Sequence, residues 1–263
     1  MQDDYGNVTL VNVSGIYDEQ PLFIDKLKKG GAGVIDAVSM TGTNGYCDDM
    51  AKENFREMMK EYPTKGIHFI DGGNYHYLTL LWLSLIEEPF DLIVFDNHSD
   101  MQKPAFGDVL SCGGWIRNLV EDSGFKGKVT VVGVDKDNID KEMKELGVKF
   151  ITKQTILKKR GQQYGLENEL IDKCWTGKRP VYISVDKDVL DEKEYKTNWN
   201  QGIMSVDELF SIIEDTFEMR KVIGMDICGE MDEAVNSEFG SIYNEINQAV
   251  NMRFLKFRIS KKI

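Results

Sequence analysis

Short apolar runs recur along the chain, and several of them end abruptly in Asp, Asn, Gly or Ser. The clearest run is Leu92–Phe95, which Asp96 and Asn97 follow at once. A strand that is buried on both faces of a sheet carries such a continuous apolar run. Strands are predicted at Val8–Val13, Gly33–Val38, Gly66–Ile70, Leu92–Phe95, Lys128–Val134, Val148–Thr152, Pro180–Val185 and Lys221–Ile227.

Segments with helical periodicity lie between these strands. The segment Ser205–Arg220 even begins with a capping box, formed by Ser205 and Glu208. Helices are predicted at Gln20–Lys29, Ala51–Tyr62, Asn74–Glu88, within Gly107–Asp122, and at Ile139–Leu146, Leu166–Trp175, Ser205–Arg220 and Ser237–Phe257. Strands that alternate with helices predict a three-layer αβα sandwich, in which a mostly parallel sheet of about eight strands is covered on both faces.

Composition fits a single soluble domain. The chain has 263 residues, 41% hydrophobic and 29% charged, and neither a repeat nor a Pro/Gly/Ser-rich linker divides it, so residues 1–263 are predicted to form one domain. The N-terminus lacks the pattern of a signal peptide, and no apolar run reaches membrane-spanning length.

The net charge of -12 argues against nucleic acid or an acidic membrane as a partner and favours cations. The four cysteines form no CxxC pair, which argues against a zinc knuckle or a disulfide framework and favours a reducing, cytoplasmic location.

The polar groups that follow the strands carry the candidate chemistry. Asp96, His98 and Asp100 occupy every second position after one apolar run, and Asp186 and Asp188 follow another with the same spacing. In parallel sheets these positions lie at one edge, where functional groups collect. Carboxylates and an imidazole that converge there need positive charge between them, so a metal site is predicted. Either motif alone could be a solvated loop.

A third segment, Gly72-Gly73-Asn74-Tyr75-His76, could add His76 to this ligand set. The segments GGNYH, DNHSD and SVDKDVLD resemble, in the same order, the GGDH, DAHxD and SxDxDxxDP motifs of the ureohydrolases: arginase, agmatinase and formimidoylglutamase. The resemblance implies an arginase-deacetylase-like α/β fold. It also implies two Mn²⁺ per chain, one held by His76, Asp96, Asp100 and Asp186 and the other by Asp96, His98, Asp186 and Asp188, with Asp96 and Asp186 bridging.

The donor chemistry agrees with this assignment. Carboxylates with imidazole and no thiolate suit six-coordinate Mn²⁺ better than structural zinc. Two cations about 3.5–4 Å apart can share a water and generate hydroxide near neutral pH, and that hydroxide would attack a guanidinium or formimino carbon. Asp100 would orient it and pass a proton to the departing amine. The predicted function is a binuclear manganese hydrolase that cleaves a C–N bond of a small, cationic guanidino or amidino compound. Related enzymes are commonly trimers or hexamers, so a homo-oligomer is expected.

The chain departs from the family pattern at several positions. His76 follows Gly-Gly by three residues rather than two, and Glu192 replaces the proline of the third motif. His68 lies inside a predicted strand as a core residue, which leaves no histidine for a proton shuttle. The segment DICGE has Gly229 where the family has its substrate-binding glutamate, and Glu230 comes one residue later.

Substrate contacts are expected from the same sheet edge. Candidates are Asn44, Tyr46, Gln102, Trp199, Gln201 and Glu230, with Glu230 as the partner for a cationic group and a catalytic residue beside Asp100. Cys47 and Cys112 are expected to be packed rather than nucleophilic, because no histidine remains to activate them.

Two other functions stay open. In a deacetylase-like amide hydrolase, one zinc would be held by Asp96, His98 and Asp186, but this would leave His76 and Asp100 without a role. Alternatively, the protein could bind metal without catalysis, for which the missing shuttle histidine is the best support.

Overall fold

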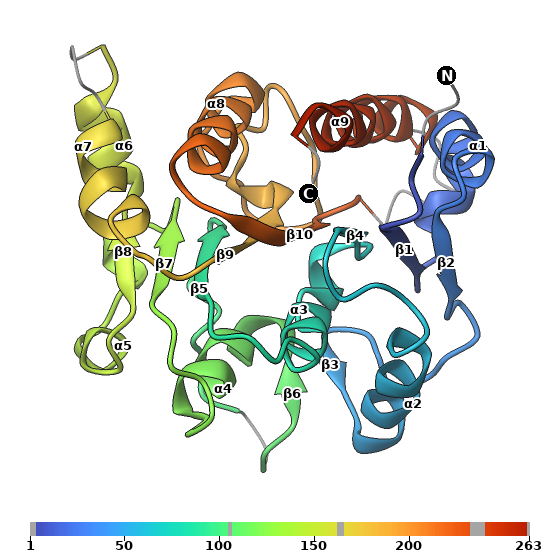
Figure 1. The fold of residues 1–263 in the computed structure, drawn as a ribbon, viewed down its shortest axis with the longest axis horizontal. Helices are drawn as coiled ribbons and strands as arrows, with labels where there is room; N and C mark the ends of the chain where they lie inside the picture. The colour runs from blue at the N-terminus through green and yellow to red at the C-terminus, as the bar shows by residue number, and fades with distance from the viewer. Residues whose placement is uncertain (1–3, 105–106, 162–165, 232–239, 262–263) are drawn as a thin grey trace.

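The computed structural model describes residues 4–104, 107–161, 166–231 and 240–261 (Figure 1). Eight parallel strands form one sheet in the order β2-β1-β4-β10-β9-β5-β7-β8, as the alternating pattern predicts. The strands are β1 Val8–Asn12, β2 Gly33–Asp36, β4 Ile67–Phe69, β5 Asp91–Phe95, β7 Val129–Val132, β8 Lys149–Ile151, β9 Val181–Asp186 and β10 Val222–Cys228. A small antiparallel pair, β3 Tyr46–Cys47 and β6 Leu110–Ser111, lies apart from this sheet.

Helices cover both faces of the sheet, so the three-layer prediction is confirmed (Figure 1). On the face drawn uppermost lie α1, α8 and α9, and on the opposite face lie α2, α3 and α4. The helices are α1 Pro21–Lys29, α2 Asp49–Met59, α3 Leu78–Leu83, α4 Trp115–Glu121, α5 Lys141–Glu145, α6 Lys153–Lys159, α7 Glu167–Leu170, α8 Val206–Met219 and α9 Gly240–Lys261. The predicted start of the last helix, Ser237, lies outside the described residues.

Two hydrophobic cores sandwich the sheet. In β5, Ile93 and Phe95 pack into the core beneath α1, α8 and α9, whereas Leu92 and Val94 pack into the core on the side of α2, α3 and α4. Successive side chains of a strand point to opposite faces, and here both faces are dry. This double burial is the physical reason for the continuous apolar run at this strand.

The predicted helix Asn74–Glu88 is shorter in the structure. A 3-10 turn at Gly73–Tyr75 precedes α3, which ends at Leu83. The Leu85 N–H donates to the Trp82 carbonyl three residues back, and the Ser84 hydroxyl donates to Leu81 O, so the α-helical hydrogen-bond ladder stops there. The capping box of α8 is present as predicted.

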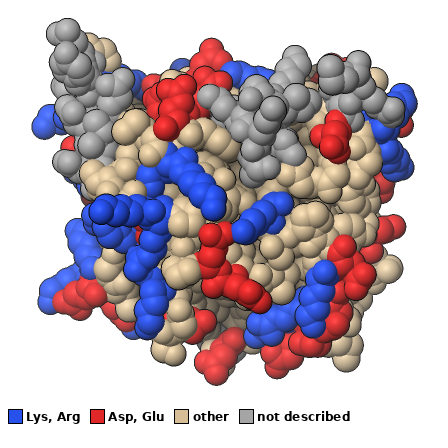
Figure 2. Space-filling model, viewed as in Figure 1, with Lys and Arg blue, Asp and Glu red and all other residues tan. Residues whose placement is uncertain are grey.

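The molecular surface carries charges of both signs. On the face shown in Figure 2, Lys and Arg side chains are interspersed with Asp and Glu side chains. Among the described residues, no helix combines the length and the apolar character needed to cross a membrane.

Candidate metal centre

The strand register brings the polar groups together at one edge of the sheet. Val185 of β9 pairs with Phe95 of β5, so the Asp96 that follows Phe95 lies level with Asp186. On the other side of β9, Asp186 pairs with Cys228 of β10. Three adjacent strands therefore deliver Asp96, Asp186 and Cys228 to the same place.

His76 meets three carboxylates of this edge. Its Nδ1 atom lies 2.9 Å from Asp100 Oδ2, 3.2 Å from Asp96 Oδ2 and 3.7 Å from Asp186 Oδ2. His76 and Asp96 are each only 1% exposed, and neither His76 Nδ1 nor Asp96 Oδ2 has a hydrogen-bond partner among the described residues. Buried atoms of this kind need a cation or a proton between them. Carboxylate and imidazole donors fit Mn²⁺ at this position.

His98 forms a second cluster beside the first. Its Nδ1 atom lies 2.7 Å from Asp188 Oδ2 and 3.6 Å from Asp96 Oδ1. The two oxygens of Asp96 thus face two different histidines, which is the arrangement that a bridging carboxylate needs. Asp186 differs, because its Oδ1 accepts the Asp188 backbone N–H at 2.9 Å while its Oδ2 faces His76. The structure brings all six predicted metal ligands together, and their binding of metal stays a prediction.

A hydrogen-bond relay orients His76. Ser184 Oγ donates to Asp226 Oδ1 at 2.6 Å and therefore accepts from His76 Nε2, 2.9 Å away. When the imidazole is neutral, as metal binding requires, this places its proton on Nε2 and directs the Nδ1 lone pair into the cluster. Outer partners of this kind hold and tune metal-binding histidines. Neither Ser184 nor Asp226 was predicted as a site residue, although Ser184 is the first residue of SVDKDVLD.

Asp100 is held in an uncommon backbone conformation. Its φ angle is 48°, in the left-handed region where residues other than glycine are rare. The indole N–H of Trp115 donates to Asp100 Oδ2 at 2.6 Å, and the Asp100 carbonyl accepts from Ile116 N in α4. Backbone strain of this kind concentrates at functional sites, where surrounding contacts maintain it.

The electrostatics of the cluster favour added positive charge. Burial raises the pKa of Asp186 and of Asp188, and repulsion from neighbouring carboxylates raises both further. Burial alone would lower the pKa of His98, but hydrogen bonds to Asp188 and Asp96 outweigh it and raise that pKa to about 11. The pKa of His76 likewise lies well above its usual value: burial opposes its charge, but Cys228, Asp100 and Asp96 favour it.

A pocket of about 180 Å³ opens onto the two clusters. Its remaining wall is uncharged and includes the predicted contacts Gln102 and Trp199 together with Ser111 and Cys112. Gly73 also forms part of this wall. A Cβ there would lie 2.9 Å from the Trp199 ring and 3.1 Å from Asp186 Oδ2, so a side chain at this position would be crowded.

The rim of the pocket is hydrogen-bonded. The Trp199 indole donates to Asn74 Oδ1 at 3.1 Å, and Asn74 Nδ2 donates to Asn44 Oδ1 at 2.8 Å. Asn44 thus supports the rim through Asn74. Tyr46, in β3, is 52% exposed and does not line the pocket.

Two predicted contact residues have other partners. Gln201 donates to the carbonyls of Leu190 and Tyr195, so its side chain holds its own loop. Glu230 is fully buried away from the pocket, in an ion pair with Lys187 that Gln20 and Asn251 complete. The expectation that Glu230 faces the substrate is wrong for this structure.

Gly229 stands where a substrate-binding glutamate was expected, and the structure leaves no room for a side chain at this position. Its φ angle is 89°, and a Cβ there would lie 2.5 Å from Asp186 Oδ1. The site beside Asp186 therefore admits only glycine.

His68 and Cys47 are buried as expected, whereas Cys112 lines the pocket instead of being fully packed. His68 is fully buried and stacks on Trp82 at 4.0 Å, and burial lowers its pKa to about 4. Cys47 is packed in a hydrophobic core. Cys112 lines the pocket, and burial followed by the charge of Asp100 raises its pKa to about 12, which disfavours a nucleophilic thiolate.

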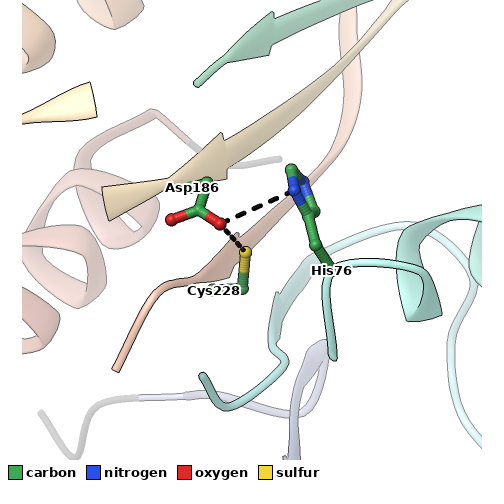
Figure 3. Close-up of side chains that lie close together, drawn as sticks. All are labelled: His76, Asp186 and Cys228. Atoms are coloured by element: carbon green, nitrogen blue, oxygen red, sulfur yellow. Dashed lines mark hydrogen bonds and ion pairs between the residues drawn. The ribbon is translucent and has the colours of Figure 1, made fainter. Parts of the chain in front are cut away.

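Cys228 is a member of the cluster that was not predicted from the sequence. Its Sγ atom donates to Asp186 Oδ2 at 3.3 Å, and it lies beside His76 (Figure 3). It is fully buried. The signal in the sequence was its place at the end of the last strand, directly before Gly229.

Comparison with known proteins identifies the family of these motifs. A family model described as the arginase family matches residues 28–231. An uncharacterized protein of Thermotoga maritima is 30% identical over 227 residues, which cover 86% of this chain and 80% of that protein.

Two solved structures share the fold. Proclavaminate amidino hydrolase of Streptomyces clavuligerus has a TM-score of 0.69 and 17% identity, over 99% of this chain and 94% of that one. Formiminoglutamase of Trypanosoma cruzi, in a structure with Mn²⁺, has a TM-score of 0.62 and 13% identity, over 94% of this chain and 92% of that one.

Proposed function

The chain belongs to the arginase family, and from this membership we propose that it is a binuclear manganese hydrolase acting on a C–N bond of a small guanidino or amidino compound. One observation carries the proposal. The two oxygens of Asp96 face the Nδ1 atoms of His76 and His98, at 3.2 Å and 3.6 Å. A carboxylate that lies between two imidazoles in this way can join two cations.

The residues that would hold the cations form two sets, with Asp96 common to both. His76, Asp100 and Asp186 would complete one set, and His98 and Asp188 the other, with Asp186 as a second bridge. Bound there, two Mn²⁺ would supply a water of lowered pKa and stabilise the negative charge that develops during attack. The relay from Asp226 through Ser184 would keep the His76 lone pair directed at its cation.

Asp100 is the residue proposed to move a proton. Its side chain lines the pocket and is within 2.9 Å of His76 Nδ1, and its Oδ2 also accepts from Trp115. From there it would orient the attacking water and pass a proton to the departing amine. Among the described lining residues the one histidine is His98, which is a proposed metal ligand, so proton exchange with solvent would run through Asp100 and water.

The pocket wall suggests the substrate class. The lining residues outside the proposed metal ligands are uncharged, and Glu230 is occupied by Lys187. A substrate would therefore present its guanidino, formimino or related amide group to the acidic cluster and an uncharged remainder to Gln102, Ser111 and Trp199. Arginine itself is not favoured, because its charged α-amino and α-carboxylate groups would lack partners there.

The deacetylase-like alternative is less well supported. A single zinc held by Asp96, His98 and Asp186 would give no role to His76 and Asp100, yet these two side chains lie 2.9 Å apart beside Asp96. A homo-oligomer, a cytoplasmic location and a single domain also remain proposals. Light scattering at high protein concentration tests the homo-oligomer, and a result that shows only monomer would contradict it.

A product screen tests the proposed function. Mn²⁺-loaded protein would be incubated with guanidino, formimino and amidino compounds while urea, ammonia and formamide are followed. We expect turnover of at least one small compound and its strong loss in Asp100→Asn, compared at equal bound metal because Asp100 is also a proposed metal ligand. Fully metallated protein that turns over none of them would favour a metal-binding protein without catalysis. Unchanged turnover in Asp100→Asn would refute the proposed proton route.

A further inference from the structure

Cys228 lies close enough to His76 and Asp186 to be a metal ligand. It ends β10, directly beside Asp186 of β9 in the sheet register. Its Sγ atom contacts Asp186 Oδ2, and that same oxygen faces His76 Nδ1 (Figure 3). Potential ligand atoms of His76, Asp186 and Cys228 all lie within 4.8 Å of one another, close enough to share one cation.

We propose that Cys228 supplies a sulfur ligand to the cation held by His76 and Asp186. The inference rests on the two-cation site of the proposed function and adds a donor that the GGDH, DAHxD and SxDxDxxDP motifs do not contain. Binding would form a metal–sulfur bond, and the thiol proton would leave to solvent.

One observation besides the cysteine itself points to a ligand. The buried His76 Nδ1 atom has no hydrogen-bond partner within the described part of the chain, and the Ser184 relay aims its lone pair into this cluster. In addition, the Gly229 backbone with its positive φ follows directly and leaves no room for a side chain beside Asp186. The sulfur is therefore the donor that β10 presents at this point.

A sulfur donor would make the two cation positions unequal. Soft thiolate ligands favour Zn²⁺, Co²⁺ or Fe²⁺, whereas carboxylate and imidazole donors also suit Mn²⁺. Among the described residues, the candidate donors at the His98 position are the carboxylates of Asp96 and Asp188 and the imidazole of His98. We expect the His76 position to select a thiophilic cation even when Mn²⁺ fills the other position.

Cobalt spectroscopy tests the proposal without measuring activity. Metal-free protein would be titrated with Co²⁺ while the near-ultraviolet thiolate-to-cobalt charge-transfer band and the bound cobalt are both recorded. The band should appear in the wild type and vanish in Cys228→Ser. Cys174→Ser and Cys47→Ser are matched controls, because both cysteines are buried in the hydrophobic cores and neither lines the pocket. Both controls should keep the band.

A second measurement uses only the wild type, in case Cys228→Ser does not fold. X-ray absorption at the zinc edge of protein loaded with one Zn²⁺ should show a sulfur scatterer at about 2.3 Å. Two bound Co²⁺ without the band, or zinc without a sulfur neighbour, would overturn the Cys228 ligand and leave the two-cation site intact. Protein that binds no cation would overturn both proposals, and the metal count separates these cases.

Discussion

Replacing Lys187 with methionine should destabilise the protein strongly although Lys187 lies outside the pocket. Lys187 sits between Asp186 and Asp188 in sequence, but its side chain is fully buried and pairs with Glu230. Its Nζ also donates to Asn251 Oδ1 at 3.1 Å and lies 5.0 Å from the centre of the Tyr195 ring. Loss of the ammonium group would leave a buried carboxylate without its cation.

The expected magnitude follows from that burial. Removing one partner of a buried ion pair costs about 3–5 kcal/mol, because the remaining charge stays desolvated. For a chain of this size the melting temperature should fall by roughly 6–20 °C. Glu230→Gln should be destabilising in the same way. The double variant Lys187→Met/Glu230→Gln should lose less than the sum of the two single losses, because neither charge is then left alone.

Urea unfolding of the metal-free protein, followed by circular dichroism, measures these losses. Lys141→Met is the matched control, because Lys141 pairs with Glu145 on the surface and its side chain is 90% exposed. Exposed pairs contribute little, so this variant should unfold like the wild type. Additive losses in the double variant would refute the pairing. A Glu230→Gln variant of normal stability but weakened substrate binding would return Glu230 to the substrate site.

Three further predictions concern the metal centre. Asp96→Asn should remove both cations, because the two Asp96 oxygens face the two histidines, whereas Asp188→Asn should mainly affect one cation. Elemental analysis of the purified variants measures the bound metal. Full metal occupancy in Asp96→Asn would contradict the bridging role of Asp96. Ser184→Ala should lower Mn²⁺ affinity about 10–100-fold by freeing the His76 ring, as measured against a competing chelator; an unchanged affinity would rule out the relay. In metal-free protein the pKa of His98 is raised to about 11, so the folded state keeps a proton that the unfolded state loses above about pH 6.5. That stabilisation is complete below about pH 6.5 and is lost as the pH rises towards 11. A metal ion on His98 must displace this proton, so Mn²⁺ should raise the melting temperature more at about pH 8.5 than at about pH 6. An equal rise at both values by thermal scanning would argue against His98 as a ligand.

The sheet was predictable because its strands are buried on both faces. Leu92–Phe95 had to be a continuous apolar run, and the carboxylates after it had to leave the core at the sheet edge. The short pair β3 and β6 was missed because two-residue strands carry no periodic signal. Helix α6 was missed as well, since a single buried residue, Ile156, gives it no repeating apolar face.

Contacts that depend on strand register could not be predicted. β9 pairs with β10, the next strand along the chain, and with the distant β5, and the meeting of Cys228 with Asp186 depends on the exact register between β9 and β10. Glu230 follows β10 and so was correctly predicted to lie at the sheet edge that carries the metal centre. Gly229 turns the chain with its positive φ, however, and the glutamate then meets Lys187. A lysine between two ligand carboxylates was the available sign that a buried acid must lie nearby.

Hydrolysis measured against metal content tests the central claim most directly. Metal-free protein would receive increasing Mn²⁺ in the presence of the guanidino or amidino compound found by the product screen, while product and bound metal are followed together. We predict that turnover rises with occupancy and reaches its plateau at two cations per chain. Turnover that is complete with one cation, or that persists after all metal is removed, would contradict a binuclear hydrolase built around Asp96.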